Sequence, residues 1–254
     1  MSRSRLTWID WLGSVLLFAA LLALWWGASH QGWISKMFLP TPEATLDKLQ
    51  SGLASGDLAS FTEATVGRMV EGWLLASLFG VALGALIGVS QRARGYLQPT
   101  LEFVRPLPAS AMLPLAIALF GLSANMVLSV VAFGAMWPVL LATVHGFATV
   151  EPRLVEVGRC LQISRSAFIF KIGLPNALPD ILAGMRLSMT IALIVTVVGE
   201  MIASQPGLGQ AILLAARAFR SSELFAGIVL LSLIGFFSNA LLSLVEQRLL
   251  RWQR

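Results

Sequence analysis

Few side chains in this sequence could support covalent or metal chemistry. The chain has two histidines, His30 and His145, and a single cysteine, Cys160. One cysteine excludes an intramolecular disulfide and a metal site made of several thiolates. There is no cluster of carboxylates, and no GxxxxGK[ST] loop of the kind that cradles ATP phosphates. We therefore predict no catalytic residue, no metal ion and no directly bound cofactor, which makes a membrane enzyme a weak hypothesis.

The ionisable residues within apolar segments are the next candidates, because a charge at membrane depth is costly and indicates function. Arg186 lies near one end of such a segment, where snorkelling or a structural ion pair competes with solute contact. Glu200 follows about 21 Å further along the same helix. It either pairs with an arginine such as Arg68 or shapes a vestibule. Arg68 has Glu71, three residues later, as an alternative partner.

Methionine side chains adapt to changing surfaces, so methionines in apolar segments are candidates for a solute pathway. Ordinary packing is the alternative for each methionine. His145 is expected to be a hydrogen-bonded residue at the membrane interface, and a role as a ligand is its alternative. The predicted pathway or gate residues are Met112, Met136, Met185, Met189 and Glu200.

The elements that carry these residues are membrane helices. The chain is 57% hydrophobic and 12% charged, whereas soluble domains are about 25% charged. Residues 106–150 contain no Asp, Glu, Lys or Arg, and as a helix they could cross a hydrocarbon layer of ~30 Å twice. We predict an all-α polytopic membrane protein that forms a single domain over residues 1–254, with its core at residues 67–246.

Six apolar segments predict six membrane-spanning helices, at residues 11–26, 69–90, 101–120, 126–147, 181–203 and 224–245. Residues 120–125 form a polar, glycine-bearing turn between the third and fourth spans. Pro106, Pro108 and Pro114 predict that the third span begins irregularly and kinks. Gly80, Gly84 and Gly88 form a small-residue stripe that favours close helix packing. An external segment at residues 32–66 is expected to hold a short helix that begins within residues 40–43.

Basic residues predict the orientation of these spans. The side that carries both termini receives eleven Lys and Arg from its loops, namely Arg3, Arg5, Arg92, Arg94, Arg153, Arg159, Arg165, Lys171, Arg248, Arg251 and Arg254. The other side receives four, namely Lys36, Lys48, Arg217 and Arg220. The richer side is therefore assigned to the cytoplasm, and the net charge of +5 indicates orientation, not nucleic-acid binding.

A long cytoplasmic loop at residues 148–178 carries the most information. Pro152 suits the first position of a helix. Leu154, Val157 and Leu161 then form an apolar stripe at positions i, i+3 and i+7. The helix either lies on the membrane surface or docks in a groove of another protein.

The same loop resembles the cytoplasmic signature of ABC importer permeases, which reads Glu-Ala-Ala, three residues, Gly, nine residues and Ile-x-Leu-Pro. Here Glu156-Val157-Gly158 is followed at the same spacing by Gln162 and by Ile172-Gly173-Leu174-Pro175. Gln162 stands where the family has a glycine, which would allow a left-handed turn. Further segments resemble nitrate, sulfonate and taurine-type permeases, in order along most of the chain: residues 38–42, 105–108, 113–115, 174–179, 184–186, 199–201 and 207–209.

This resemblance implies a type I ABC importer permease in the bacterial inner membrane, with both termini cytoplasmic. The implied partners are a second permease copy in a homodimer, two cytoplasmic subunits that bind ATP and Mg, an external substrate-binding protein and the lipid membrane. The implied ATPase-coupling residues are Arg153, Leu154, Glu156, Val157, Gly158, Leu161, Gln162, Ser164, Ile172, Leu174 and Pro175.

The implied solute is a small anion such as a sulfonate, taurine or nitrate, imported by alternating access driven by the ATPase partners. The chain would then be a transport subunit and not an enzyme. The alternative hypothesis is a self-sufficient secondary transporter or channel. Such a protein is expected to have inverted repeats or several intramembrane ionisable groups, and neither is clear in this sequence.

Overall fold

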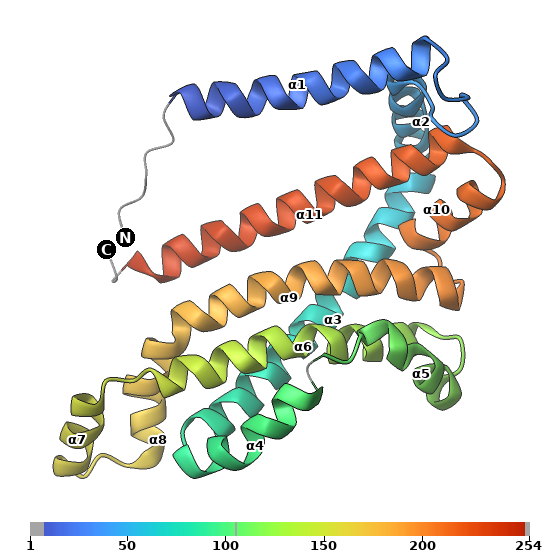
Figure 1. Cartoon of the computed structure of the whole chain (residues 1–254). Coiled ribbons are helices and arrows are strands. Elements are labelled where there is room, and N and C mark those ends of the chain that lie inside the picture. Colours follow the sequence, from blue (N-terminus) through green and yellow to red (C-terminus); the bar gives the residue numbers. More distant parts are fainter. Residues whose placement is uncertain (1–7, 105, 252–254) are drawn as a thin grey trace. The chain divides into compact units, whose positions relative to one another are not determined.

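The computed structural model describes residues 8–104 and 106–251, and these fold into helices joined by short turns (Figure 1). Arg3, Arg5, Arg105 and Arg254, which entered the orientation and family arguments, lie outside the described residues. The α-helices are α1 (Trp8–His30), α2 (Pro42–Ser55), α3 (Asp57–Gly88), α4 (Gln91–Val104), α5 (Leu113–Phe120), α6 (Ala124–Ala148), α7 (Pro152–Cys160), α8 (Arg165–Phe168), α9 (Leu174–Ala203), α10 (Leu208–Arg217) and α11 (Ser221–Leu249). A 3₁₀ turn, Ala109–Met112, precedes α5, and a π-helical turn, Ile169–Gly173, precedes α9.

The predicted all-α polytopic fold is confirmed. Five described helices, α1, α3, α6, α9 and α11, are long and apolar enough to cross a membrane. The segment α4 and the segment Ala109–Phe120 are sharply bent relative to each other. If the two are counted together as one broken span, the described residues contain six candidate spans. The predicted third span is therefore two helices. Pro114 falls in the first turn of α5, where its missing N–H costs nothing, so it begins a helix instead of kinking one.

Two other predicted boundaries differ from the structure. Helix α3 begins at Asp57, inside the predicted external segment, and α9 begins at Leu174, inside the predicted loop. Pro175 lies in the first turn of α9, a position that tolerates proline because its N–H would be unpaired there anyway. The helix then continues through Pro179, which precedes the predicted span at residues 181–203.

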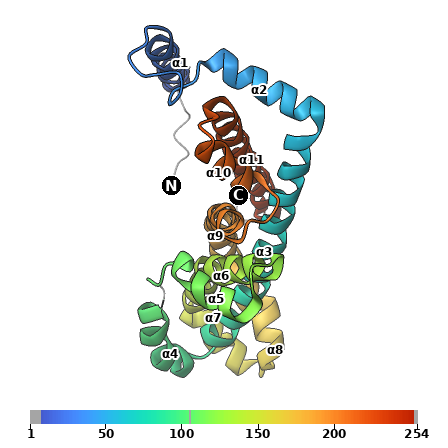
Figure 2. The same ribbon diagram turned by 90° about the vertical axis from the view of Figure 1, so that its right-hand side faces the viewer.

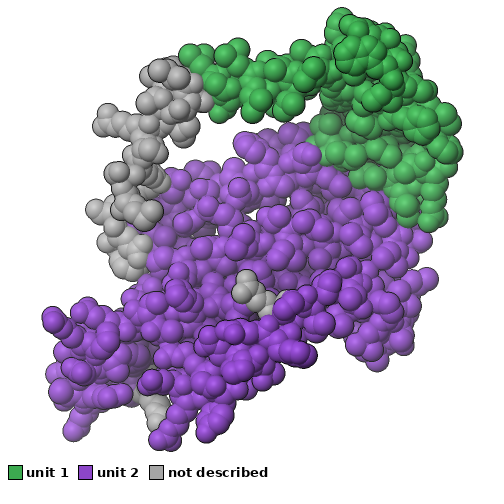
Figure 3. Space-filling view, viewed as in Figure 1, with its two compact units in different colours: residues 1–59, 211–230 green, residues 60–210, 231–254 purple. Residues whose placement is uncertain are grey.

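The chain forms two compact units, which Figure 3 distinguishes by colour. The first comprises residues 1–59 and 211–230. Within it, Thr41 caps α2 by accepting a hydrogen bond from the Ala44 N–H at 3.2 Å, so the predicted helix start within residues 40–43 is confirmed. The Trp25 indole N–H donates to the Pro40 carbonyl at 2.9 Å, and the Trp26 N–H donates to Glu43 at 2.8 Å.

The second unit comprises residues 60–210 and 231–254, and its centre is the pair α6 and α9. These helices run side by side in opposite directions, and α7 and α8 lie at one end of the pair (Figures 1 and 2). We call this end the α7 end. Glycines allow the close approach: a Cβ at Gly184 would overlap the Pro138 carbonyl, and one at Gly199 would overlap Val127.

Helix α3 packs on α6 through the predicted glycine stripe. A Cβ added at Gly80, Gly84 or Gly88 would overlap a side chain of α6, respectively Val139, Thr143 and Phe147. The stripe therefore brings the two backbones together, as expected for small residues between membrane helices. This packing fixes α3 against α6.

Candidate functional site

Helix α7 is the amphipathic helix expected in the loop at residues 148–178. Pro152 occupies the first helical turn, after Glu151 at the N-cap position. The apolar stripe is uncovered within the second unit: the residues Leu154, Val157 and Leu161 are 43%, 51% and 68% exposed. A row of exposed apolar side chains on a short helix is typical of a surface that another molecule covers.

A left-handed residue ends α7, at the position where the resemblance expects glycine. Gln162 has φ of +51°. The Ile163 N–H donates to the Gly158 carbonyl at 3.0 Å and the Gln162 N–H to the Arg159 carbonyl at 3.0 Å. These two bonds form a Schellman motif, which pairs the free carbonyls at a helix end. The turn is thus made without glycine, at the steric cost of a left-handed Gln162.

The predicted coupling residues separate into exposed and packed sets. Gly158 is buried, and a Cβ there would lie 3.3 Å from the Phe168 ring of α8, so it permits contact between the two helices. Ser164 accepts a hydrogen bond from the Ala167 N–H at 3.3 Å and so caps α8. The exposed set is Arg153, Leu154, Glu156, Val157, Leu161, Gln162 and Ser164, and the partly buried set is Ile172, Leu174 and Pro175.

A polar clamp joins the two ends of this loop. The Asn176 side chain, at the start of α9, donates to the Gly146 carbonyl of α6 at 2.9 Å. Thr149 donates to the same carbonyl at 3.0 Å. That carbonyl lies in the last turn of α6, where it has no partner within the helix. A Cβ at Gly146 would overlap Ala177, so the two helices touch at the clamp.

A cavity of about 690 Å³ lies along α6 and α9, and we call it the α6–α9 cavity. It extends from His145 and Asp180 at the α7 end to Gly134 and Ile191, about 16 Å along the helices. Its lining residues are Leu107, Ala109, Gly134, Trp137, Pro138, Leu141, Ala142, His145, Asp180, Ala183, Gly184, Leu187, Thr190 and Ile191. The cavity size lies within the range of small-molecule sites.

The predicted pathway methionines lie elsewhere. Met136 and Met185 pack against the hydrophobic core, and Met189 belongs to it. Met112 ends the 3₁₀ turn before α5 and is partly buried. None of these four lines the α6–α9 cavity, and their role in a pathway remains a prediction.

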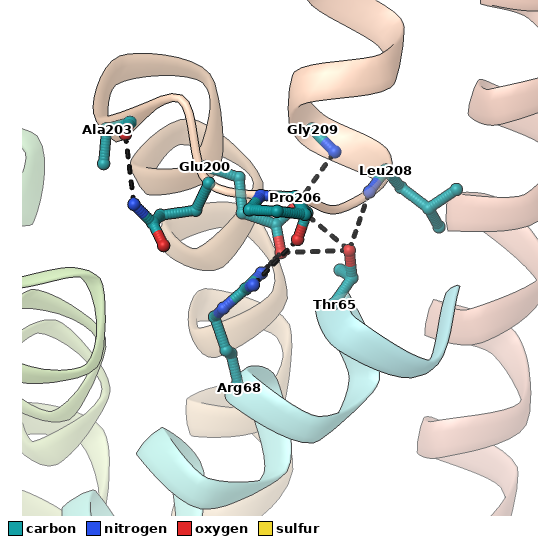
Figure 4. A network of polar contacts seen from close by, with 8 residues as sticks. Thr65, Arg68, Glu200, Ala203, Pro206, Leu208 and Gly209 are labelled. Carbon is teal, nitrogen blue, oxygen red and sulfur yellow. Dashed lines mark hydrogen bonds and ion pairs between the residues drawn. The ribbon is translucent and has the colours of Figure 1, made fainter. Parts of the chain in front are cut away.

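Glu200 is completely buried in a polar network at the other end of α9 (Figure 4). Its carboxylate accepts hydrogen bonds from the Thr65 hydroxyl at 3.0 Å, from the Gly209 N–H at 2.9 Å and from Arg68. Arg68 also donates to the Pro206 carbonyl at 2.7 Å. The Thr65 hydroxyl oxygen in turn accepts from the Leu208 N–H at 2.9 Å.

This network explains the glycines that follow Glu200. A Cβ at Gly207 would overlap the Glu200 carboxylate, and one at Gly209 would overlap the Val197 carbonyl. The ion pair of Arg68 is with Glu200, as one of the two sequence interpretations expected. With its charge paired and its oxygens hydrogen-bonded, Glu200 is arranged to join α3, α9 and the start of α10.

Arg186 also has a carboxylate partner. It forms an ion pair with Glu246 of α11, which is the structural alternative considered for it. Its Nε is buried and lacks a hydrogen-bond partner among the described residues. A small enclosed space of about 30 Å³ lies beside it, lined in part by Thr190 and Ser238.

The cavity residues were missed by sequence reasoning. Trp137, Leu141 and His145 recur at i, i+4 and i+8 on α6, so they share one face of that helix. Helix α6 is apolar on every side, however, and such a helix carries no sequence signal that tells one face from another. Only the packing of α6 against α3 and α9 shows which face of α6 lines the cavity.

Comparisons with known proteins agree with this architecture. The profile of the family described as "Binding-protein-dependent transport system inner membrane component" matches residues 76–251. The aliphatic sulfonates transport permease protein SsuC of Bacillus subtilis is 34% identical over 243 residues, which cover 96% of this chain and 88% of that protein. The taurine transport system permease protein TauC of Escherichia coli is 30% identical over 244 residues, covering 94% and 89%. The nitrate import permease protein NrtB of Leptolyngbya laminosa is 31% identical over 185 residues, covering 73% and 66%.

Two solved structures share the fold. The MetNI methionine ABC transporter, in an inward-facing conformation, matches with a TM-score of 0.62 and 16% identity, over 74% of this chain and 91% of that chain. An amino acid ABC transporter crystallised with histidines matches with a TM-score of 0.61 and 20% identity, over 79% and 97%. The chain belongs to the family of binding-protein-dependent transport system inner membrane components and is a permease of an ABC transporter.

Proposed function

We propose that this permease forms the solute pathway of an importer as a homodimer and couples to two cytoplasmic ATPase subunits through α7. The observation that carries the proposal is the exposed stripe of Leu154, Val157 and Leu161 on α7. Burial of such a stripe in a groove of a partner follows the helix-in-groove mode of recognition. ATP and Mg bind to the partners, since this sequence has no phosphate-binding loop of the Walker type.

The clamp at the base of α7 supports a mechanical route. Asn176 ties the end of α6 to the start of α9, and these two helices line the α6–α9 cavity. A pull on α7 by the closing ATPase dimer therefore acts on both walls together. Closure at one end and opening at the other would give alternating access.

The solute class follows from the relatives. The three relatives are named for the transport of aliphatic sulfonates, taurine and nitrate. We propose that this permease imports a small organic anion of the sulfonate or taurine type, delivered by an external binding protein. In this proposal α7 and both termini lie in the cytoplasm and the protein resides in the bacterial inner membrane.

Reconstitution tests the proposal. The permease should co-purify with a Walker-motif ATPase, and uptake into proteoliposomes should stop when that ATPase is inactivated. Uptake that continues without any ATPase would support the alternative of a self-sufficient transporter and refute the proposal.

A charge reversal on α7 tests the docking surface. Glu156 is exposed beside the stripe, so in the proposed interface Glu156→Lys reverses the docking charge. It should lower ATP-dependent uptake at least tenfold, because a charge of the wrong sign at an interface costs several kcal/mol. Glu63→Lys, at an exposed position of α3, is the matched control and should retain uptake. Normal uptake and ATPase binding by Glu156→Lys would remove Glu156 from the interface.

A further inference from the structure

Helix α4 carries the most exposed large apolar and aromatic side chains in the described part of the chain. Tyr96 and Phe103 are 83% and 84% exposed, and no residue of α4 is buried. The helix lies toward the α7 end of the second unit (Figure 1) and begins three residues after α3 ends at Gly88. Aromatic side chains that their own chain covers so little indicate a surface that another molecule covers.

Three exposed residues form one stripe along α4, which we call the α4 stripe. Arg92, Tyr96 and Phe103 occupy positions i, i+4 and i+11, which share one face of a helix. Along the helix axis a guanidinium comes first, then a phenol, and about 17 Å from the start a wholly apolar ring. Another face of α4 carries Gln98 and Glu102, whose side chains hydrogen-bond to each other at 2.9 Å. The α4 stripe therefore has the polarity of an amphiphile, with one charged end and one apolar end.

The position of α4 in the chain gives the stripe a direction relative to the membrane. Helix α3 is long and apolar enough to span the membrane, so α4, which follows its end, begins near the membrane surface. After α4 the chain continues into the apolar segment Ala109–Phe120, so Phe103 lies on the way from the surface to the interior. An interfacial layer of about 5–8 Å covers each side of the hydrocarbon core. The 17 Å of the stripe can thus reach from lipid headgroups to acyl chains.

The charged end of the stripe is available to a headgroup. The neighbouring Arg94 is held by α3, because its guanidinium donates to the Gly88 carbonyl at 2.9 Å. Arg92 is exposed and forms no ion pair with any described residue. A guanidinium matches the geometry of a phosphate group. In the proposed orientation this end of α3 faces the cytoplasmic leaflet, whose anionic lipids attract basic residues.

The apolar end of the stripe continues a surface that suits acyl chains. Leu83 and Leu86, in the last two turns of the spanning helix α3, are 40% and 73% exposed. Tyrosine is enriched at the boundary between headgroups and hydrocarbon, and Tyr96 lies between the charged and the apolar ends of the stripe. An amphipathic helix with arginine at its polar end and aromatic residues along its apolar face is typical of a helix that lies against lipid.

We propose that the α4 stripe binds an anionic phospholipid, with the phosphate on Arg92 and an acyl chain along Tyr96 and Phe103. The lipid holds α4, which has no buried residue of its own, at the membrane surface. This inference goes beyond the proposed function, because it depends on residence in a membrane and not on coupling to an ATPase.

Fluorescence quenching in lipid nanodiscs locates the stripe. The full-length permease, with Cys160→Ser to remove its single thiol, carries bimane at Thr100→Cys. This exposed position lies four residues after Tyr96 and three before Phe103. The matched control carries bimane at Gln98→Cys, which is exposed on the other face. Phosphatidylcholine with a nitroxide on its acyl chain should quench the first probe strongly and the second weakly, and equal quenching would overturn the proposal.

A comparison of two headgroups tests Arg92. In discs with equal amounts of phosphatidylglycerol and phosphatidylcholine, the nitroxide is placed on one lipid or on the other. Quenching of the Thr100 probe should correspond to about fivefold local enrichment of phosphatidylglycerol. Arg92→Gln should abolish this enrichment and Arg92→Lys should retain most of it. Arg217→Gln, at an exposed basic position of α10, is the control and should leave the enrichment unchanged.

The remaining outcomes separate the alternatives. Added inorganic phosphate has no acyl chain and should not displace the lipid; displacement would show a simple anion site and refute the lipid assignment. No enrichment, or enrichment that survives Arg92→Gln, would refute the role of Arg92. A Thr100 probe that neither nitroxide lipid quenches would show that water or a protein covers α4 instead. Because these discs contain no ATPase, failed quenching sinks this inference alone, whereas a lack of ATP-dependent uptake sinks the proposed function alone.

Discussion

Removal of one partner of the Arg68–Glu200 ion pair should destabilise the permease strongly. Glu200 has no exposed surface, and the Arg68 side chain is 16% exposed. In Glu200→Gln the new amide group would point N–H donors at the donors Thr65, Gly209 or Arg68. We expect a loss of about 3–5 kcal/mol in the free energy of unfolding, the usual cost of leaving a buried charge unpaired.

A double-mutant cycle measures whether the pair acts as a unit. Arg68→Met leaves the Glu200 charge buried without its partner and should cost a similar amount. The double variant should be more stable than the sum of the two losses by about 1–3 kcal/mol. Stability is measured by denaturant titration of the full chain in mixed micelles, with helix content as the readout.

An exposed ion pair supplies the control. Arg220 and Glu223 are 54% and 36% exposed, so Glu223→Gln should change stability by less than about 1 kcal/mol. A loss below about 1 kcal/mol for Glu200→Gln, or strict additivity in the cycle, would refute the structural role. If Glu200→Gln instead folds normally and loses uptake, Glu200 is a gate residue, as the sequence alone allowed.

Three further results are expected. Asn176→Ala removes one of the two donors to the Gly146 carbonyl. We expect more ATP to be hydrolysed per solute imported, while the free energy of unfolding falls by only about 1 kcal/mol. An unchanged ratio of ATP hydrolysed to solute imported would exclude the clamp from coupling. Gln162→Gly removes the steric cost of a left-handed side-chain-bearing residue and should stabilise the α7 turn by up to about 1 kcal/mol. The stabilisation should be measured as slower amide hydrogen exchange at Ile163, and faster exchange would contradict it. Cys160 is exposed, so in cells expressing the permease alone a membrane-impermeant maleimide should label it only after permeabilisation, and labelling of intact cells would invert the proposed orientation.

The parts of the fold that depend on neighbouring residues were predictable from the sequence. Thr41 and Pro42 begin α2 through a local cap. Likewise Gly121 and Ser123 end α5 and begin α6 through backbone conformation and a side-chain cap, which a short polar stretch between apolar segments indicates. The glycine stripe on α3 was also predictable, because the spacing of small residues reports the closeness of a neighbouring helix.

The features that depend on distant residues were not predictable in the same way. The interpretation that Glu200 pairs with an arginine could name Arg68 but could not decide between Glu200 and Glu71 as its partner. That decision depends on α3 and α9 lying close together, with Gly207 and Gly209 leaving space for the carboxylate. The start of α9 was misplaced because proline usually breaks a helix, and only its position in the first turn makes Pro175 compatible with one.

The glycines along α6 and α9 connect these observations. Close contact at Gly146 near the clamp and at Gly199 near the Glu200 network leaves little freedom for the two helices to slide past each other. Between these contacts, residues of both helices line the α6–α9 cavity. A force applied to α7 is therefore more easily relieved by moving the pair as one body than by separating its members. The two lines of evidence then agree: a rigid pair of helices that lines the α6–α9 cavity, and an exposed helix, α7, attached at one end of that pair.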